Sequence, residues 1–279
     1  MLTSPSIDPA PSAETRDADA ALEAELIAEM TPLIADLAVE GNGAVALGGS
    51  RAKGRSDARS DYDFRVYADG FEQDRRNSMS WNRFEAAMAG WEARGFRTDG
   101  VWPRVYANVQ RDLSAWLAGS GTLKTFEWTI WGYHLPTDIF HQQIISDPRG
   151  TLAGWKQQLA TYPDAMRDAL VSQNMEILRY WATDYHYASK VARRDLVFLV
   201  GLTGKLANTI LQVVFAHNRT YFPGDGWNLA MAEDLPRLPP DFHARMTAFL
   251  EPDRDPGGWE RQRVQVIEII SDLEVLTAE

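Results

Sequence analysis

A glycine turn between two apolar segments constrains the fold of this chain more than any other feature. The sequence reads LGGSRAKGRSDARSDYDFRVY over residues 47–67. The apolar residues 44–47 and the alternating residues 62–67 predict two short strands. Gly48, Gly49 and Ser50 directly follow the first strand, and such small residues leave backbone N–H groups open to the approach of an anion.

Two carboxylates lie at the start of the second predicted strand, one directly before it and one at its second residue. Asp61 and Asp63 are two residues apart, and residues at this spacing on a strand point to the same face. Mg²⁺ prefers carboxylate and phosphate oxygens. The turn and the acidic pair together therefore predict a site that binds Mg²⁺ and the phosphates of a nucleotide, with Asp61 and Asp63 as metal ligands and catalytic residues.

Composition argues against several classes of function and of binding partner. Hydrophobic residues make up 45% of the 279 residues, which supports a substantial core, and the formal net charge is −11. An acidic chain is a poor non-specific binder of nucleic acid. Cysteine is absent, which excludes thiolate chemistry and disulfides. We find no basic and apolar leader and expect no membrane-spanning run, so we expect a cytoplasmic protein without a membrane partner.

Periodicity predicts an α+β chain in which a small mixed-sheet domain precedes an all-helical bundle. The Pro-, Ser- and Ala-rich residues 1–16 predict a disordered tail. Residues 17–150 combine helices over 17–40 and 79–94 with the two strands, and the alternation over 104–110 predicts a third strand. After a turn at residues 147–150, the pattern is almost entirely helical. We expect helices over 151–161, 163–182, 184–217, 239–250 and 258–277, within a domain of residues 151–279.

The turn and the acidic pair resemble the motif of the DNA polymerase β-like nucleotidyltransferase superfamily. In that resemblance Gly48, Gly49 and Ser50 hold the triphosphate, and Asp61 and Asp63 bind Mg²⁺, with two ions expected. The implied reaction moves a nucleoside monophosphate, AMP from ATP, to a hydroxyl of a small molecule. A helical second half also occurs in aminoglycoside nucleotidyltransferases.

The second half is similar to an uncharacterised bacterial group of nucleotidyltransferase-like proteins. The segments that carry this similarity are Gly132-Tyr133, Asp147-Pro148-Arg149-Gly150, Arg194-Asp195-Leu196, and residues 214–224 and 234–239. This group has no defined substrate, so the resemblance does not identify the acceptor. An acidic cleft would attract a cationic one.

The chain departs from the superfamily pattern at the third carboxylate. Residues 104–110, the expected third strand, contain no acid, and Asn108 is the candidate ligand in its place. Three explanations remain open. A different residue, Glu92, Asp99 or Glu127, supplies the acid; a substrate group completes the site; or the protein binds a nucleotide without catalysis.

Cationic and polar side chains supply further candidates for binding the nucleotide. Arg51 and Ser60 flank the motif, and Lys190 and Arg194 lie in a predicted helix of the second half. Basic side chains are suited to phosphate groups. Besides a small-molecule enzyme, the alternatives are a toxin-type nucleotidyltransferase acting on tRNA or protein and a catalytically degenerate nucleotide-binding or regulatory protein. The sequence does not predict an oligomeric state.

Overall fold

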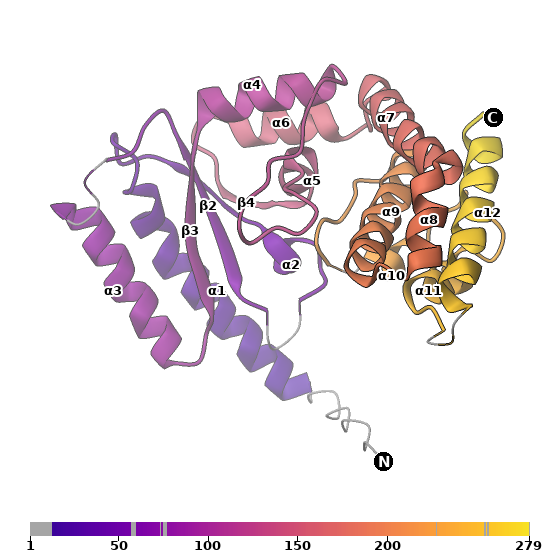
Figure 1. The fold of residues 1–279 in the computed structure, drawn as a ribbon. Helices are drawn as coiled ribbons and strands as arrows, with labels where there is room; N and C mark the ends of the chain where they lie inside the picture. The colour runs from indigo at the N-terminus through magenta and orange to yellow at the C-terminus, as the bar shows by residue number, and fades with distance from the viewer. Residues whose placement is uncertain are drawn as a thin grey trace, which may run out of the picture. The chain divides into compact units, whose positions relative to one another are not determined.

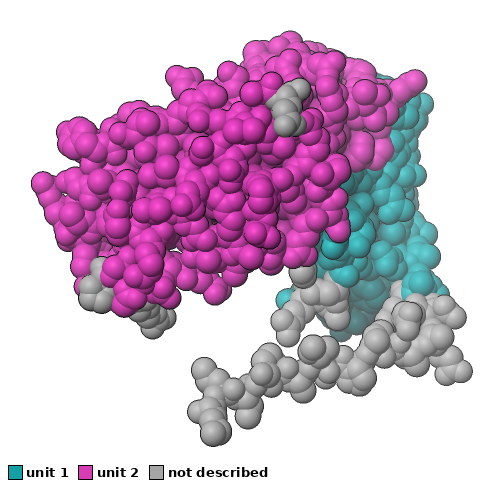
Figure 2. Space-filling model, turned by 90° about the vertical axis from the view of Figure 1, so that its right-hand side faces the viewer, with its two compact units in different colours: residues 1–108, 141–153 teal, residues 109–140, 154–279 magenta. Residues whose placement is uncertain are grey.

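The protein is described by a computed structural model that covers residues 13–56, 60–72, 74, 77–226, 228–253, 255 and 257–278. Residues 1–12 of the predicted disordered tail lie outside this description, and helix α1 (Ala13–Ala35) begins within the remainder of that stretch. The internal contacts group the chain into two compact units (Figure 2). The first comprises residues 1–108 and 141–153, and the second comprises residues 109–140 and 154–279.

Neither unit is one continuous stretch of chain. Residues 141–153 belong to the first unit, because strand β4 (Gln143–Ser146) pairs with β1. The sequence pattern did not predict this strand. A domain boundary at residue 150 stays a prediction.

A four-stranded mixed sheet forms the centre of the first unit, in the order β3-β2-β1-β4 (Figure 1). Strand β1 (Ala44–Leu47) pairs antiparallel with both β2 (Tyr62–Ala68) and β4. Strand β3 (Thr98–Val105) pairs parallel with β2. One small mixed sheet with many helices is consistent with the predicted α+β class.

The two faces of the sheet differ in character. Tyr62, Phe64 and Val66 alternate along β2 and are buried in a cluster with apolar residues of α1 and of α3 (Met79–Ala93). Ser78 caps α3, since its Oγ accepts a hydrogen bond from the backbone N–H of Trp81 at 3.3 Å. The intervening positions of β2, which include Asp63 and Arg65, therefore lie on the opposite face of the sheet.

The predicted third strand over residues 104–110 is wrong. The strand ends at Val105, and residues Tyr106–Leu117 form helix α4. Tyr106, Val109, Leu113 and Trp116 are all buried, and their spacing of three or four residues is that of one helical face. The apparent alternation over this short stretch was part of a helical pattern, which takes a longer window to recognise.

The second unit consists mainly of helices around one apolar core. The helices of the C-terminal half are α6 (Thr151–Leu159), α7 (Asp164–Thr183), α8 (Tyr185–Arg193), α9 (Leu196–His217), α10 (Asn228–Ala232), α11 (Phe242–Leu250) and α12 (Gly258–Ala278). They follow α5 (Leu135–His141). Leu206 and Ile210 of α9 are fully buried with Ile269 of α12 and Met246 of α11. Helix α9 is thus the central element of this unit.

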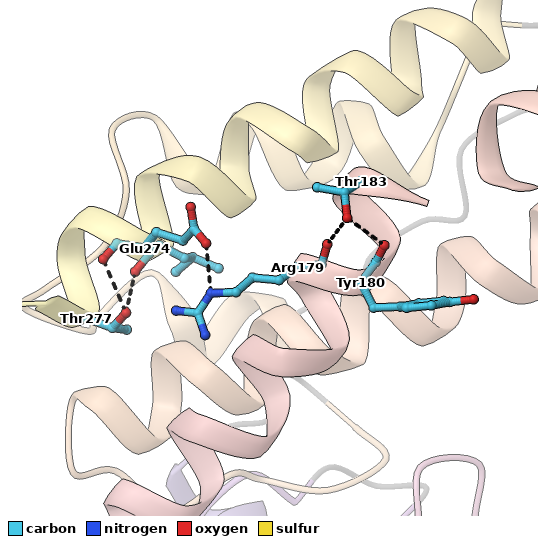
Figure 3. Close-up of polar contacts among 6 residues, drawn as sticks. Arg179, Tyr180, Thr183, Glu274 and Thr277 are labelled. Carbon is cyan, nitrogen blue, oxygen red and sulfur yellow. Dashed lines mark hydrogen bonds and ion pairs between the residues drawn. The ribbon is translucent and has the colours of Figure 1, made fainter. Parts of the chain in front are cut away.

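At the surface of the unit, α7 and α12 are joined by an ion pair. Arg179 Nε lies 2.8 Å from Glu274 Oε1 (Figure 3). Thr183 and Thr277 donate their hydroxyl protons to carbonyls of their own helices, those of Arg179 and Leu273. Exposed pairs of this kind add little stability, so the packing of the apolar core holds α7 and α12 together.

The predicted helix over residues 184–217 is two helices. Helix α8 ends at Arg193, Arg194 adopts the left-handed conformation with φ 53°, and α9 begins at Leu196. By length and composition alone α9 could cross a membrane, contrary to our reading that no run is long enough, and 61% of its most apolar window is buried in the protein. A core helix has the same properties, so the absence of a membrane partner stays a prediction.

Candidate functional site

The glycine turn lies directly against the second carboxylate of the motif. Helix α2 (Gly49–Ala52) begins inside the turn, and Gly49 has φ +64°. A Cβ atom at Gly49 would lie 1.7 Å from Asp63 Oδ2. The backbone N–H of Gly48 donates to the carbonyl oxygen of Asp63 at 2.8 Å. The structure thus brings together the predicted phosphate turn and one of the two predicted metal ligands.

Arg51 holds the chain that leads into β2. Its Nε donates to the carbonyl oxygen of Asp61 at 3.0 Å, and its Nη2 donates to that of Ser60 at 2.9 Å. The guanidinium carbon lies 3.8 Å from the centre of the Tyr62 ring, and Nη1 lies 3.8 Å from Glu23 Oε2. These contacts position the backbone on which Asp61 is carried. Both Arg51 and Ser60, predicted to bind nucleotide, therefore contribute to the geometry of the motif.

Asp61 lines an open hollow at the edge of the sheet. The other lining residues are Glu92, Gly95, Phe96, Arg97 and Thr98. Glu92 Oε1 accepts a hydrogen bond from the Thr98 hydroxyl at 3.3 Å. Two carboxylates, Asp61 and Glu92, therefore border one solvent-accessible space.

Asp63 is paired with a buried arginine that our sequence analysis did not single out. Arg65 Nη1 lies 3.6 Å from Asp63 Oδ1, and the residue is 8% exposed. Across β3, Trp102 is in register with Arg65, and Arg104 with Tyr67. The alternation from Asp63 to Arg65 was a visible signal for a shared face. That Trp102 and Arg104 lie on this face as well follows only from the pairing register of β3 with β2.

The candidates for the third metal ligand lie in different parts of the structure. Asn108 lies on helix α4 and is exposed. It is therefore not on a strand, as was expected of a residue that completes the site. In β3 the register shifts between the partners of Tyr62 and Phe64, so that Asp99 and Gly100 together lie opposite Asp63. Gly100 has φ +76°, which is typical of a bulge. Asp99 is thus nearest in register to Asp63, whereas the exposed Glu127 belongs to the second unit.

Among the described residues, the acidic side chains of the motif belong to no larger metal-binding cluster. Across the described ranges, no group of three or more His, Cys, Asp or Glu side chains could hold a metal ion. Mg²⁺ is commonly bound through one or two carboxylates together with substrate phosphates. Two carboxylates, those of Asp61 and Asp63, would be a donor set of this size for one ion.

Lys190 and Arg194 lie in the second unit and have local structural roles. Lys190 Nζ donates to Asp195 Oδ2 at 2.6 Å and lies 4.9 Å from the centre of the Phe198 ring. The hydrogen bond from Lys190 lowers the pKa of Asp195. Arg194 is exposed at the left-handed end of α8. These contacts give Lys190 a role at the α8–α9 junction, and the binding of a nucleotide by Lys190 and Arg194 stays a prediction.

Asp225 in the Pro-Gly-Asp-Gly loop anchors another loop of the same unit. Its carboxylate accepts hydrogen bonds from the backbone N–H groups of Ile130 and Trp131, at 3.0 and 2.9 Å. The Trp131 ring in turn lies against Gly204 of α9, where a Cβ atom would be 3.0 Å from its Cη2. Asp225 therefore fixes the loop that places Trp131 on α9.

We expect Asp225→Ala to accelerate amide hydrogen exchange at Ile130 and Trp131 by about tenfold, because each amide loses a charge-assisted acceptor. Global stability should change by only about 1 kcal/mol, since the site is exposed. Asp234→Ala, at an exposed position of the same unit, is the control. Unchanged exchange at both amides in the Asp225 variant would contradict this role.

Comparison with known proteins adds a family similarity in the centre of the chain. Residues 136–228 match the family model described as "Domain of unknown function (DUF4037)". This match covers about a third of the chain and runs from α5 to the start of α10. It does not include the glycine turn or the acidic pair. No curated protein matches the chain.

Proposed function

We propose that this protein is a Mg²⁺-dependent nucleotidyltransferase that moves a nucleoside monophosphate, AMP from ATP, to a hydroxyl group of a small molecule. The observation that supports it most is the close approach of the glycine turn to Asp63, one residue of the acidic pair. With no Cβ at Gly49, the turn lies against the Asp63 carboxylate. A bound metal and the phosphates it neutralises would then meet the backbone N–H groups of Gly49 and Ser50, since the N–H of Gly48 already donates to the carbonyl oxygen of Asp63.

Asp61 and Asp63 would hold the metal ion. Bound Mg²⁺ would supply positive charge to neutralise the phosphates and stabilise the transferring group. The proposal needs one ion, bound by two carboxylates and by nucleotide oxygens, and does not depend on a second.

The reaction balances without a further co-reactant. The acceptor oxygen forms a bond to the α-phosphorus, and the bond from that phosphorus to the bridging oxygen of the β-phosphate breaks. Pyrophosphate leaves with the electron pair, and the acceptor proton passes to water. The protein would orient the two substrates. The turn would bind the phosphates, and the acidic pair would hold the metal ion beside them.

The net charge of −11 guides the proposal for partners and location. It favours a small acceptor, in particular a cationic one, over nucleic acid. We propose a cytoplasmic enzyme without a membrane partner.

A second candidate is a nucleotide-binding protein without catalysis. The pairing of Asp63 with Arg65 favours it, since a buried guanidinium competes with a metal for that carboxylate. ATP and Mg²⁺ bound without turnover would support this candidate against the first.

The test is release of pyrophosphate from nucleoside triphosphates with Mg²⁺ and a panel of hydroxyl-bearing acceptors. We expect Asp61→Asn to reduce turnover by at least about a hundredfold, because a neutral amide is a poor Mg²⁺ ligand. Glu85→Gln, an exposed position on α3 of the same unit, should leave turnover unchanged. Equal activity of the two variants would refute the assigned site.

A further inference from the structure

Two arginines flank one indole ring on the sheet face that carries Asp63. Arg65 of β2 is in register with Trp102 of β3. The guanidinium carbon of Arg65 lies 5.2 Å from the centre of the Trp102 ring, and that of Arg104 lies 4.5 Å from it. Arg104 also lies 5.7 Å from the centre of the Tyr67 ring. Because aromatic faces attract cations, the Trp102 ring helps to position both guanidinium groups, and the Tyr67 ring adds a second contact for Arg104.

Arg65 extends this cationic face to the glycine turn. A Cβ atom at Gly48 would lie 3.0 Å from both the guanidinium carbon and Nη2 of Arg65. The guanidinium therefore packs on the turn itself, next to the N–H groups predicted to meet a phosphate. Arg65 is buried, with 8% of its surface exposed, and electrostatic attraction to an anion is stronger where water is excluded.

The two guanidinium groups are chemically suited to an anionic ligand. Arg65 Nη1 also lies 3.6 Å from Asp63 Oδ1 and donates to the carbonyl oxygen of Phe64 at 3.3 Å. Guanidinium groups bind phosphate oxygens in a bidentate manner, so two of them in succession suit a chain of phosphates. Arg65 and Arg104 would thus extend the phosphate site from the glycine turn along β2 to β3.

We propose that Arg65 and Arg104 bind the polyphosphate chain of the nucleotide. This assignment rests on the proposed function and specifies the phosphate-binding residues of that site. It places the phosphate contacts in the same unit as the turn, in residues that the sequence had not suggested.

The experiment measures binding of inorganic tripolyphosphate by calorimetry in metal-free buffer, so that Asp61 and Asp63 are not required as metal ligands. We expect Arg104→Gln to raise the dissociation constant by at least about tenfold, the effect of losing a charged hydrogen-bond donor. Arg104→Lys, which keeps the charge, should recover part of the affinity. Arg83→Gln removes an exposed cation of the same unit that pairs with Asp36 at 3.0 Å, and should change the affinity less than twofold.

Equal affinity of the Arg104→Gln and Arg83→Gln variants for tripolyphosphate would overturn the assignment. So would an effect on inorganic phosphate that is absent for tripolyphosphate, because it would point to a single phosphate group of another ligand. Failure of the proposed function is distinguishable: tripolyphosphate binding that depends on Arg104, without pyrophosphate release from any triphosphate, would leave a phosphate site on a protein that does not transfer nucleotides.

Discussion

The Gly49→Ala substitution should lower the free energy of unfolding by about 3 kcal/mol and abolish the proposed nucleotide transfer. Two effects add. The left-handed conformation at φ +64° costs a residue with a Cβ atom about 1–2 kcal/mol. The new Cβ would also lie 1.7 Å from Asp63 Oδ2 and 2.6 Å from its Cγ, and overpacking of this kind typically costs about 1–3 kcal/mol. Relief of the clash requires the carboxylate or the turn to move, and either change separates the proposed phosphate site from the proposed metal ligand.

Gly54→Ala is a matched control in the same segment. Gly54 has φ +65°, almost the same conformation, but no atom lies within 4 Å of the position of its Cβ. Urea unfolding of both variants isolates the contribution of the clash, since the backbone strain is common to them. Similar losses of stability in the two variants, with transfer retained in Gly49→Ala, would show that the contact between Gly49 and Asp63 is unimportant.

Stability should fall by about 3 kcal/mol between pH 7 and pH 4 through His134 alone. Complete burial lowers the pKa of this histidine from 6.5 to about 3. Between these values the unfolded chain binds a proton that the folded chain does not, so the free energy of unfolding decreases as the pH falls. The contribution is fully present above pH 6.5 and is progressively lost on acidification.

The surroundings of His134 explain why its neutral form is required. Its Nδ1 lies 2.7 Å from the Thr137 hydroxyl, which itself donates to the carbonyl oxygen of Phe222 at 2.8 Å. The Trp116 ring is 4.5 Å away between centres. Within the described residues, Nε2 is buried without a hydrogen-bond partner, so a second proton there would be left unsolvated.

The measurement is denaturant unfolding of the wild type and of His134→Phe at several pH values. Carboxylates contribute equally to both proteins, so the difference between their pH dependences isolates the imidazole. His243→Gln, which replaces a half-exposed histidine that lies 3.0 Å from Glu233 Oε1, is the control for the loss of a histidine at another position. A slope in His134→Phe as steep as in the wild type would contradict the prediction.

The elements near the motif were predictable because their signals are local. Strands β1 and β2 follow each other along the chain and pair directly, so alternation and the glycine turn were enough to place Asp63 next to Gly49. The third strand was misplaced because Val105, Ala107 and Val109 alternate for a few residues at the start of a helix. The left-handed Arg194 ended α8 within a continuous helical pattern, and periodicity alone does not detect a single residue of that kind.

The sequence by itself determined which residues form the turn and that Asp61 and Asp63 flank the start of one strand, since these depend on neighbours along the chain. Only the tertiary structure decided what surrounds them. The parallel pairing of β3 with β2, with its shift at Gly100, placed Trp102 beside Arg65 and Arg104 beside Tyr67. That register depends on the packing of separate elements against one core, because no local rule specifies which residues of two distant strands lie opposite each other.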